Sequence, residues 1–377
     1  MRFGAKFLRN ELRGKRGPFV VIANHEAALD FVNMVRATSK KINIVASNSF
    51  YQTLPIKRFM DMVGVIPKQQ FQTTLSDMRA MKSVVENEGI LGIYPAGLMC
   101  EDGLSTPIPE ATYAFLQWMR SDIYVIRSYG TYFCTPKWSS KRRKGKTLID
   151  AYRLFTKEEL AGLEVSEIKR RTEEALCFDA YRENERLGIE YRGGDNIEGL
   201  ENVLYVCPHC GREFTMRVRD TNTIYCTECG FAEVSDRRGI LTKVSEVGEE
   251  VRYVSDWATM IFNREAERIA RGEDITLDFE ADIQTVSKRQ KRFVKIAEGR
   301  VVLSPESIVI HTGGLVPVDV KVPTSSFPSL PFSPGKYIEV QDGDNIYRCV
   351  FHDGKMAMKY INVLKALHAA KGAVEAN

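Results

Sequence analysis

Two pairs of cysteines constrain the fold of this chain more than any other sequence feature. Cys207 and Cys210 form the first pair and Cys226 and Cys229 the second, with 15 residues between the pairs and a glycine directly after each. Two residues between paired cysteines fit a tight turn that points both thiolates at one metal ion, and four thiolates make a closed tetrahedral Zn²⁺ site. The spacing therefore predicts a structural zinc ribbon at residues 200–237.

Cysteine use and charge also limit the cellular setting. Four of the eight cysteines occur in these close pairs, which in a reducing compartment favours a metal over disulfides. No apolar run approaches the roughly 18–20 residues that span a bilayer, and no signal peptide is visible. We therefore expect a cytoplasmic protein. The net charge of +4 is too small to indicate a nucleic-acid-binding chain, so no nucleic-acid partner is expected.

The first 190 residues show strands alternating with helices. Apolar runs predict buried strands, and amphipathic stretches with caps predict helices between them. Strands are expected at 18–24, 42–46, 90–94 and 123–127, and helices at 31–39, 74–88 and 110–120. Thr156 and Glu159 form a capping box that opens a long charged helical region ending near Gly188. This alternation predicts an α/β domain at residues 1–190, with helices on both faces of its sheet.

Residues 250–377 carry a different pattern. A helix is expected near 257–270, followed by seven short strands and a helix at 355–370; the strands are expected at 275–279, 293–296, 301–303, 308–311, 318–322, 337–340 and 346–351. This predicts a mostly-β barrel-like module with a C-terminal helix. The pattern resembles pleckstrin-homology and GRAM-type barrels, which implies binding of lipid headgroups or proteins.

His25 and Asp30 form the first candidate site, where the first predicted strand ends. Ligands bind at strand ends in α/β sheets. Across a turn, the carboxylate can hold one imidazole nitrogen and leave the other to accept a proton. Spacing alone equally fits a solvated loop histidine, with Asp30 as the N-cap of the following helix.

The order of four blocks resembles the glycerolipid acyltransferase family that contains the lysophosphatidate acyltransferases, over residues 15–185. The family's first block, N-H-x4-D, matches Asn24, His25 and Asp30. Its second, G-x-x-x-x-R, is similar to residues 64–68 with Lys68 in place of arginine. Its third, F-P-E-G-T-R-S followed by D-G, is similar to residues 94–103, and its fourth to residues 123–127.

The resemblance implies transfer of a fatty acyl group from acyl-CoA or acyl-carrier protein to a hydroxyl of a lysophospholipid-type acceptor. His25 would act as general base and Asp30 would orient it, so that no cysteine nucleophile is needed and Cys100 is a bystander. The resemblance also implies substrate-binding positions, namely Asn24, Lys68, Tyr94, Pro95 and Gly97.

Two positions depart from the third block. Ala96 and Met99 stand where the family has glutamate and arginine, which engage the glycerol and phosphate of the acceptor. This leaves the acceptor open. It also leaves an alternative, a membrane- or protein-binding adaptor whose acyltransferase domain has degenerated.

Two basic segments indicate an anionic membrane surface as partner, on the inner face of the membrane. Arg2, Lys6, Arg9 and Arg13 recur at helical spacing, which predicts an interfacial helix if the segment is not simply a solvated basic terminus. Residues 137–146 carry six cations and no acid. They fit lipid headgroups, the phosphates of CoA, an acidic carrier protein, or an exposed hairpin tip.

Overall fold

The computed structural model describes residues 5–28, 30–47, 51, 64–69, 73–287, 290, 292–313, 317–343 and 345–375. Its contacts divide the chain into two units, one of Met1–Lys137 with Lys141–Gly194 and the other of Trp138–Ser140 with Asp195–Asn377. The predicted ribbon and β-rich module both fall in the second unit, and their separate boundaries stay predictions.

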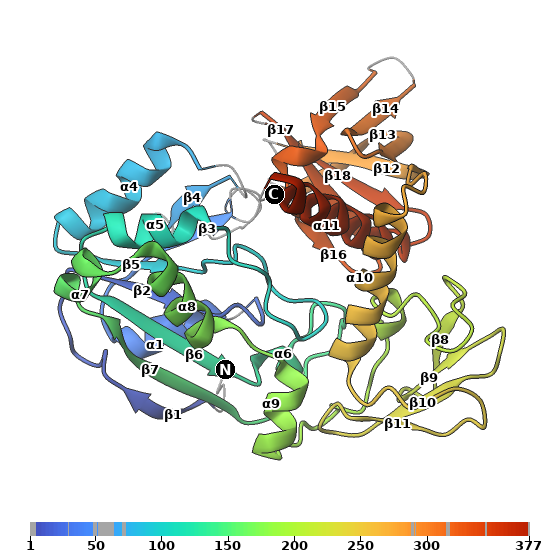
Figure 1. Ribbon diagram of the computed structural model, residues 1–377, viewed down its shortest axis with the longest axis horizontal. Coiled ribbons are helices and arrows are strands. Elements are labelled where there is room, and N and C mark those ends of the chain that lie inside the picture. The colour runs from blue at the N-terminus through green and yellow to red at the C-terminus, as the bar shows by residue number, and fades with distance from the viewer. Residues whose placement is uncertain are drawn as a thin grey trace. The chain divides into compact units, whose positions relative to one another are not determined.

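A seven-stranded sheet forms the centre of the first unit, in the order β1-β7-β6-β2-β5-β3-β4 (Figure 1). Its strands are β1 (Ala5–Asn10), β2 (Phe19–Ala23), β3 (Asn43–Ser47), β4 (Ile66–Lys68), β5 (Ile90–Ile93), β6 (Ile123–Tyr129) and β7 (Thr147–Phe155). The pairs from β6 to β4 are parallel, whereas β7 runs antiparallel to β6. The carboxyl ends of β2, β5 and β4 therefore meet at one edge.

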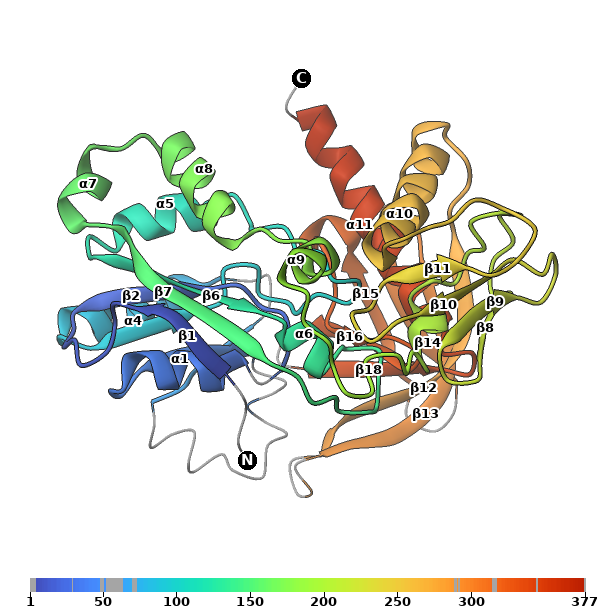
Figure 2. The same cartoon turned by 90° about the horizontal axis from the view of Figure 1, so that it is seen from below.

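Helices cover both faces of this sheet, as the sequence predicts. They are α1 (Asp30–Thr38), α4 (Leu75–Glu86), α5 (Ala111–Trp118), α6 (Thr131–Cys134), α7 (Lys157–Gly162), α8 (Val165–Leu176) and α9 (Ala180–Leu187). Figure 2 shows α1 on one side of the sheet and α5 and α8 on the other. Alternate residues of β2 enter the two cores: Val20 and Ile22 pack with α4, α5 and α8, and Val21 packs with α1.

The helix starts follow the predicted caps. Thr74 and Asp77 form a capping box at α4, and Thr156 and Glu159 form one at α7. The long helical region expected after Thr156 is divided into α7, α8 and α9. The backbone is extended at Leu163 and Cys177, which ends the first two of these helices.

The predicted N-terminal interfacial helix is wrong for residues 5–10. These residues form β1, which pairs with β7 at the edge of the sheet, and Arg9 donates two hydrogen bonds to Asp150 at 2.8 and 3.0 Å. Cations that repeat at helical spacing are also compatible with a strand, because pairing with β7 supplies hydrogen bonds that no local pattern reports. Arg2 lies outside the described residues.

The second unit begins with a four-stranded antiparallel sheet, β8 (Met216–Arg219), β9 (Thr223–Cys226), β10 (Ala232–Ser235) and β11 (Leu241–Lys243). Helix α10 (Val254–Ala270) follows it. Trp257 on this helix is fully buried, and its indole N–H donates to the carbonyl of Val206 at 2.8 Å. A hydrogen bond from a buried indole therefore fixes α10 against the segment that leads into the first cysteine pair.

A mostly-β half-barrel module completes the chain. Its seven strands are β12 (Leu277–Ser287), β13 (Arg292–Leu303), β14 (Ser307–Thr312), β15 (Asp319–Pro323), β16 (Phe332–Ser333), β17 (Tyr337–Asp342) and β18 (Asn345–Phe351), in the order β15-β14-β13-β12-β18-β17-β16. Helix α11 (Met356–Glu375) packs Tyr360 and Ile361 into this core. Two of the predicted strands, 293–296 and 301–303, are parts of the single long strand β13. Among the described residues, no helix combines the length and apolar character that crossing a membrane requires.

Candidate active site

The candidate residues of the first and third blocks lie at the carboxyl edge of the central sheet. His25 follows β2, and Tyr94 follows β5. These two strands are neighbours and run parallel. Chain topology therefore brings residues almost 70 positions apart to one place, and the His25 and Tyr94 rings stack with their centroids 4.2 Å apart.

His25 and Asp30 form the predicted pair. The Nδ1 atom of His25 lies 3.1 Å from Oδ2 of Asp30, which is the first residue of α1 and 2% exposed. The same oxygen accepts the main-chain N–H groups of Glu26 and Ala27 at 2.7 and 2.8 Å. An ionised carboxylate is an acceptor only, so the Nδ1 that it faces carries the proton and Nε2 is the basic nitrogen.

Hydrogen bonds of Asn24 hold the start of this turn against β6. Its amide N–H₂ donates to the carbonyl of Ser128 at 2.9 Å, and its Oδ1 accepts the N–H of Ser128 at 2.8 Å. Both bonds are buried, and together they fix which way the amide faces. Asn24 thus holds the backbone beside His25, and its predicted role in substrate binding stays a prediction.

Glu26 is a buried acid that the sequence analysis did not single out. It is 1% exposed, and its Oε2 accepts the Thr131 hydroxyl at 2.8 Å and the Tyr132 N–H at 3.0 Å. Its Oε1 accepts a third bond, from the Asn24 amide at 3.1 Å. Burial raises the pKa of Glu26 to about 7, although the nearby Arg127 guanidinium opposes the shift. Its one signal in the sequence was its position directly after His25 in the first block.

A small pocket opens beside His25. Its lining is largely apolar, with two hydroxyls and one thiol, and comprises Ala23, Asn24, His25, Pro95, Ala96, Leu98, Ser105, Thr106, Ile108, Leu176, Cys177 and Phe178. The predicted positions Asn24 and Pro95 line it, together with the departing residue Ala96. His25 is thus one of the residues that line a small, largely apolar pocket.

The remaining third-block positions form the loop after β5. Gly97 is exposed and has a left-handed φ of 70°, and its N–H donates to the carbonyl of Tyr94 at 2.9 Å in a tight turn. The N–H of Cys100 donates to the carbonyl of His25 at 3.2 Å, which ties this loop to the first block. Burial raises the pKa of the Cys100 thiol well above its usual range, which agrees with its assignment as a bystander.

Two lysines bring positive charge to this edge of the sheet. Lys68 ends β4, three strands from β2, so at the usual strand spacing its backbone is about 14 Å from that of β2. Lys137 is nearer, because its ammonium donates to the Met99 carbonyl at 3.5 Å and the adjoining Cys100 N–H meets His25. These contacts place the Lys137 ammonium within about 9 Å of the His25 carbonyl oxygen. Lys137 is thus a cation close to the main chain of both the first and the third block.

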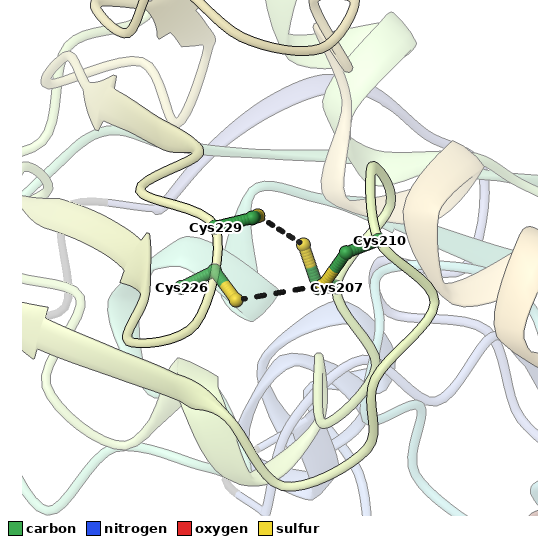
Figure 3. A group of neighbouring side chains, drawn as sticks. All are labelled: Cys207, Cys210, Cys226 and Cys229. Carbon is green, nitrogen blue, oxygen red and sulfur yellow. Dashed lines mark hydrogen bonds between the residues drawn. The ribbon is translucent and has the colours of Figure 1, made fainter.

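The four predicted zinc ligands come together in the second unit (Figure 3). The Sγ atoms of Cys207 and Cys229 are 3.6 Å apart, and those of Cys210 and Cys226 are 3.8 Å apart. A tetrahedron with Zn–S bonds of about 2.3 Å has sulfur separations of about 3.8 Å, whereas a disulfide is about 2.05 Å long. The four thiols fit one Zn²⁺ ion and are not paired as disulfides.

Both cysteine pairs sit in matching turns. Gly211 donates its N–H to the carbonyl of Cys207 at 3.0 Å, and Gly230 donates to that of Cys226 at 3.2 Å. Both glycines have left-handed φ values, 70° and 77°. The glycine after each pair therefore lets the chain close the turn that presents two sulfurs on one side.

Comparison with known families gives the geometry a context. Residues 6–144 match the family model described as Acyltransferase. These residues form an acyltransferase-family domain. The match includes the turn with His25 and Asp30, the loop after β5, and β6, and it lies within the half of the chain where the blocks were found.

Two solved structures are similar in part. The 1-acyl-sn-glycerophosphate (LPA) acyltransferase PlsC from Thermotoga maritima is 16% identical over 49% of this chain and 72% of its own, with a TM-score of 0.41. The Slm1-PH domain, whose title describes ligand binding in a non-canonical site, is 19% identical over 25% of this chain and 97% of its own, with a TM-score of 0.17. At these values, neither structure assigns a function to this chain.

Proposed function

We propose that this acyltransferase-family protein is an O-acyltransferase of phospholipid synthesis, which acylates a hydroxyl of a lysophospholipid-type acceptor. The observation that carries the proposal is the His25 imidazole, oriented by Asp30 at 3.1 Å and lining an apolar pocket. The acyl donor is a thioester, either acyl-CoA or acyl-carrier protein. The family match over residues 6–144 supports the reaction class.

In the proposed reaction, Nε2 of His25 takes the proton of the acceptor hydroxyl as the oxygen attacks the thioester carbonyl carbon. A carbon–oxygen bond forms, the carbon–sulfur bond breaks, and the leaving thiolate receives the proton back from the imidazolium. Asp30 stabilises that imidazolium through its bond to Nδ1. No acyl-enzyme forms, in keeping with the buried, neutral thiol of Cys100.

Acceptor recognition is the finer part of the proposal. We expect the anionic headgroup to be met by Lys137, with Lys68 further out, because the side chains of Ala96 and Met99 carry no charge. A lysine gives a point charge and not the planar fork of an arginine, so it discriminates less between phosphate geometries. A lysolipid with a substituted phosphate is therefore as suitable an acceptor as lysophosphatidate.

Because a lysophospholipid acceptor would reside in a membrane, we propose a cytoplasmic enzyme that docks peripherally on anionic lipid. In the second unit we propose a structural zinc ribbon, with ligands Cys207, Cys210, Cys226 and Cys229, and a pleckstrin-homology or GRAM-like module. The sheet order supports the likeness of this module to pleckstrin-homology and GRAM-type barrels. It pairs β12, the first strand of the module, with β18, its last strand.

The test is acyl transfer by the full chain from acyl-CoA or acyl-carrier protein to lysolipids that differ in headgroup. We expect turnover that falls at least a thousandfold in His25→Gln, because the base is lost while its size is kept. His311→Gln is the matched control, since His311 lies exposed on β14 of the other unit. Full activity of His25→Gln would reject this mechanism.

The departures at Ala96 and Met99 favour a second candidate, an adaptor whose acyltransferase domain has lost its chemistry. It predicts co-sedimentation with anionic vesicles but no turnover with any donor and acceptor pair. In that case, His25→Gln and Asp30→Asn leave vesicle binding unchanged. Turnover that depends on His25 would exclude it.

A further inference from the structure

We propose that Glu26 is a positioning residue of this acyl transfer: its carboxylate clamps the turn that carries His25 to α6. This inference rests on the function proposed above. Glu26 does not touch the reacting atoms. It lies between His25 and the elements that support the turn, and it acts through them.

Glu26 connects the turn in two directions. Its main-chain N–H donates to Oδ2 of Asp30 at 2.7 Å, the oxygen that also binds His25 Nδ1 at 3.1 Å. Its side chain accepts from Thr131 and Tyr132, which lie more than 100 residues further along the chain at the start of α6. Any shift of the carboxylate is therefore passed directly to the residue that orients the imidazole.

The three donors around Glu26 require a carboxylate. Thr131 and Tyr132 donate to Oε2, and the Asn24 amide donates to Oε1. A glutamine keeps one acceptor oxygen, so its NH₂ group must face a donor. If the oxygen stays on the α6 side, the NH₂ group meets the NH₂ of Asn24. That amide cannot turn over, since Ser128 holds both of its ends.

A contribution to folding stability does not explain why a carboxylate occupies position 26. Its side chain is fully buried, and burial raises its pKa to about 7, so the ionised form costs folding free energy near neutral pH. A neutral group would avoid this cost. A buried carboxyl group with a perturbed pKa next to the candidate base, hydrogen-bonded to the turn that carries it, points to a role in the reaction.

Protonation of Glu26 should break the clamp. The groups that face it electrostatically are Arg127 on β6, Asp30 on α1, Cys100 after β5, Cys134 on α6 and Tyr191, besides the adjoining His25. Burial raises the pKa of each of the three thiol and phenol groups, which stay neutral near pH 7. The deprotonation of Glu26 then contributes to the acidic side of the rate profile.

The experiment compares kcat and KM of the full chain from pH 5 to 9 in the wild type, Glu26→Gln and Glu183→Gln. Glu183→Gln is the matched control, because Glu183 is a second acid beside Arg127, with which it forms an ion pair, and it lies on α9, outside the turn. In the wild type, log kcat should fall more steeply below neutral pH than it does in Glu26→Gln. Glu26→Gln should lower kcat at pH 8 at least tenfold and keep both KM values within twofold.

Glu183→Gln should keep kcat within twofold of the wild type and retain the wild-type slope of the acidic limb. A Glu26→Gln enzyme with wild-type kcat and slope would overturn the proposal. If Glu26→Gln does not fold, Thr131→Val removes one donor at 2.8 Å and should move the acidic limb to higher pH. An unmoved limb in Thr131→Val would overturn it equally.

A second readout does not depend on activity. The ring nitrogens of His25, assigned by their loss in His25→Gln, should give the ¹⁵N signals of a fixed Nδ1–H tautomer in the wild type. Glu26→Gln should average the two tautomers, and unchanged signals would count against the clamp. If the wild type turns over no substrate, the proposed function fails, and these signals still decide the role of Glu26.

Discussion

Replacing Asp30 with asparagine separates the charge of this residue from its hydrogen bonds. One oxygen, Oδ2, accepts all three bonds, from His25 Nδ1 and from the N–H groups of Glu26 and Ala27. The other oxygen, Oδ1, is buried and has no hydrogen-bond partner in the part of the chain that the structure describes. An asparagine fits with its carbonyl oxygen at the Oδ2 position, so the turn survives while the negative charge is lost.

The lost charge matters only when the imidazole is protonated, which is the state formed during the proposed transfer. Two unit charges about 4 Å apart attract by about 4 kcal/mol at an effective dielectric constant of 20. The amide dipole of asparagine retains part of this attraction. We therefore expect a loss of about 3 kcal/mol in the transition state, or about a hundredfold in kcat, with little change in KM.

The assay follows release of the donor thiol, with urea unfolding as the measure of stability and Asp30→Ala as the companion variant. Asp30→Asn should stay within about 1 kcal/mol of the wild type, whereas Asp30→Ala loses three hydrogen bonds and about 3 kcal/mol. A kcat for Asp30→Asn within threefold of the wild type would refute the role of the charge. If both variants were equally unstable, the single-oxygen geometry would be wrong.

Four further predictions test other parts of the molecule. Elemental analysis should find about one zinc per chain. Cys207→Ser should lose this zinc, and the second unit should then no longer unfold cooperatively. A metal-free wild type with unchanged unfolding would contradict the ribbon. Lys137→Met should raise KM for an anionic lysolipid about fivefold or more at unchanged kcat, and an unaltered KM would remove this lysine from the headgroup site. Gly92→Ala should destabilise the first unit by about 1–3 kcal/mol in urea, because the added Cβ lies 2.5 Å from the sulfur of Met34. Burial raises the pKa of Glu26 from 4.5 to about 7, so the folded state binds this proton more tightly than the unfolded chain. The contribution of this proton to the free energy of unfolding is complete below pH 4.5 and is lost as pH rises through 7. Relative to Glu26→Gln, the free energy of unfolding of the wild type should fall by about 3 kcal/mol over that range.

The sequence predicted the features whose causes are local. His25 and Asp30 are five residues apart across one turn, and the capping box at Thr156 spans three residues. The grouping of the four cysteines was also predictable. Each pair needs only a tight turn, and one zinc ion with four ligands requires the two pairs to come together. Their sulfur positions agree with that prediction.

Features that depend on distant partners were missed or misread. The edge strand β1 was expected to be a helix, because its pairing with β7 joins Arg9 to Asp150, 141 residues away. The buried carboxylate of Glu26 depends on Thr131 and Tyr132, and nothing near it in the chain reports them. Lys137 comes near the site only because the loop after β5 folds back toward the first block.

The position of β1 bears on how this protein is made. Its strand partner β7 ends at Phe155, and the register pairs Ala5 with Thr147. At ribosomal rates of roughly 5–20 residues per second, about 8–30 seconds of synthesis separate the emergence of the two strands. During that interval the nascent chain carries an unmatched basic strand, whose charges discourage neighbouring nascent chains on the same messenger from pairing with it.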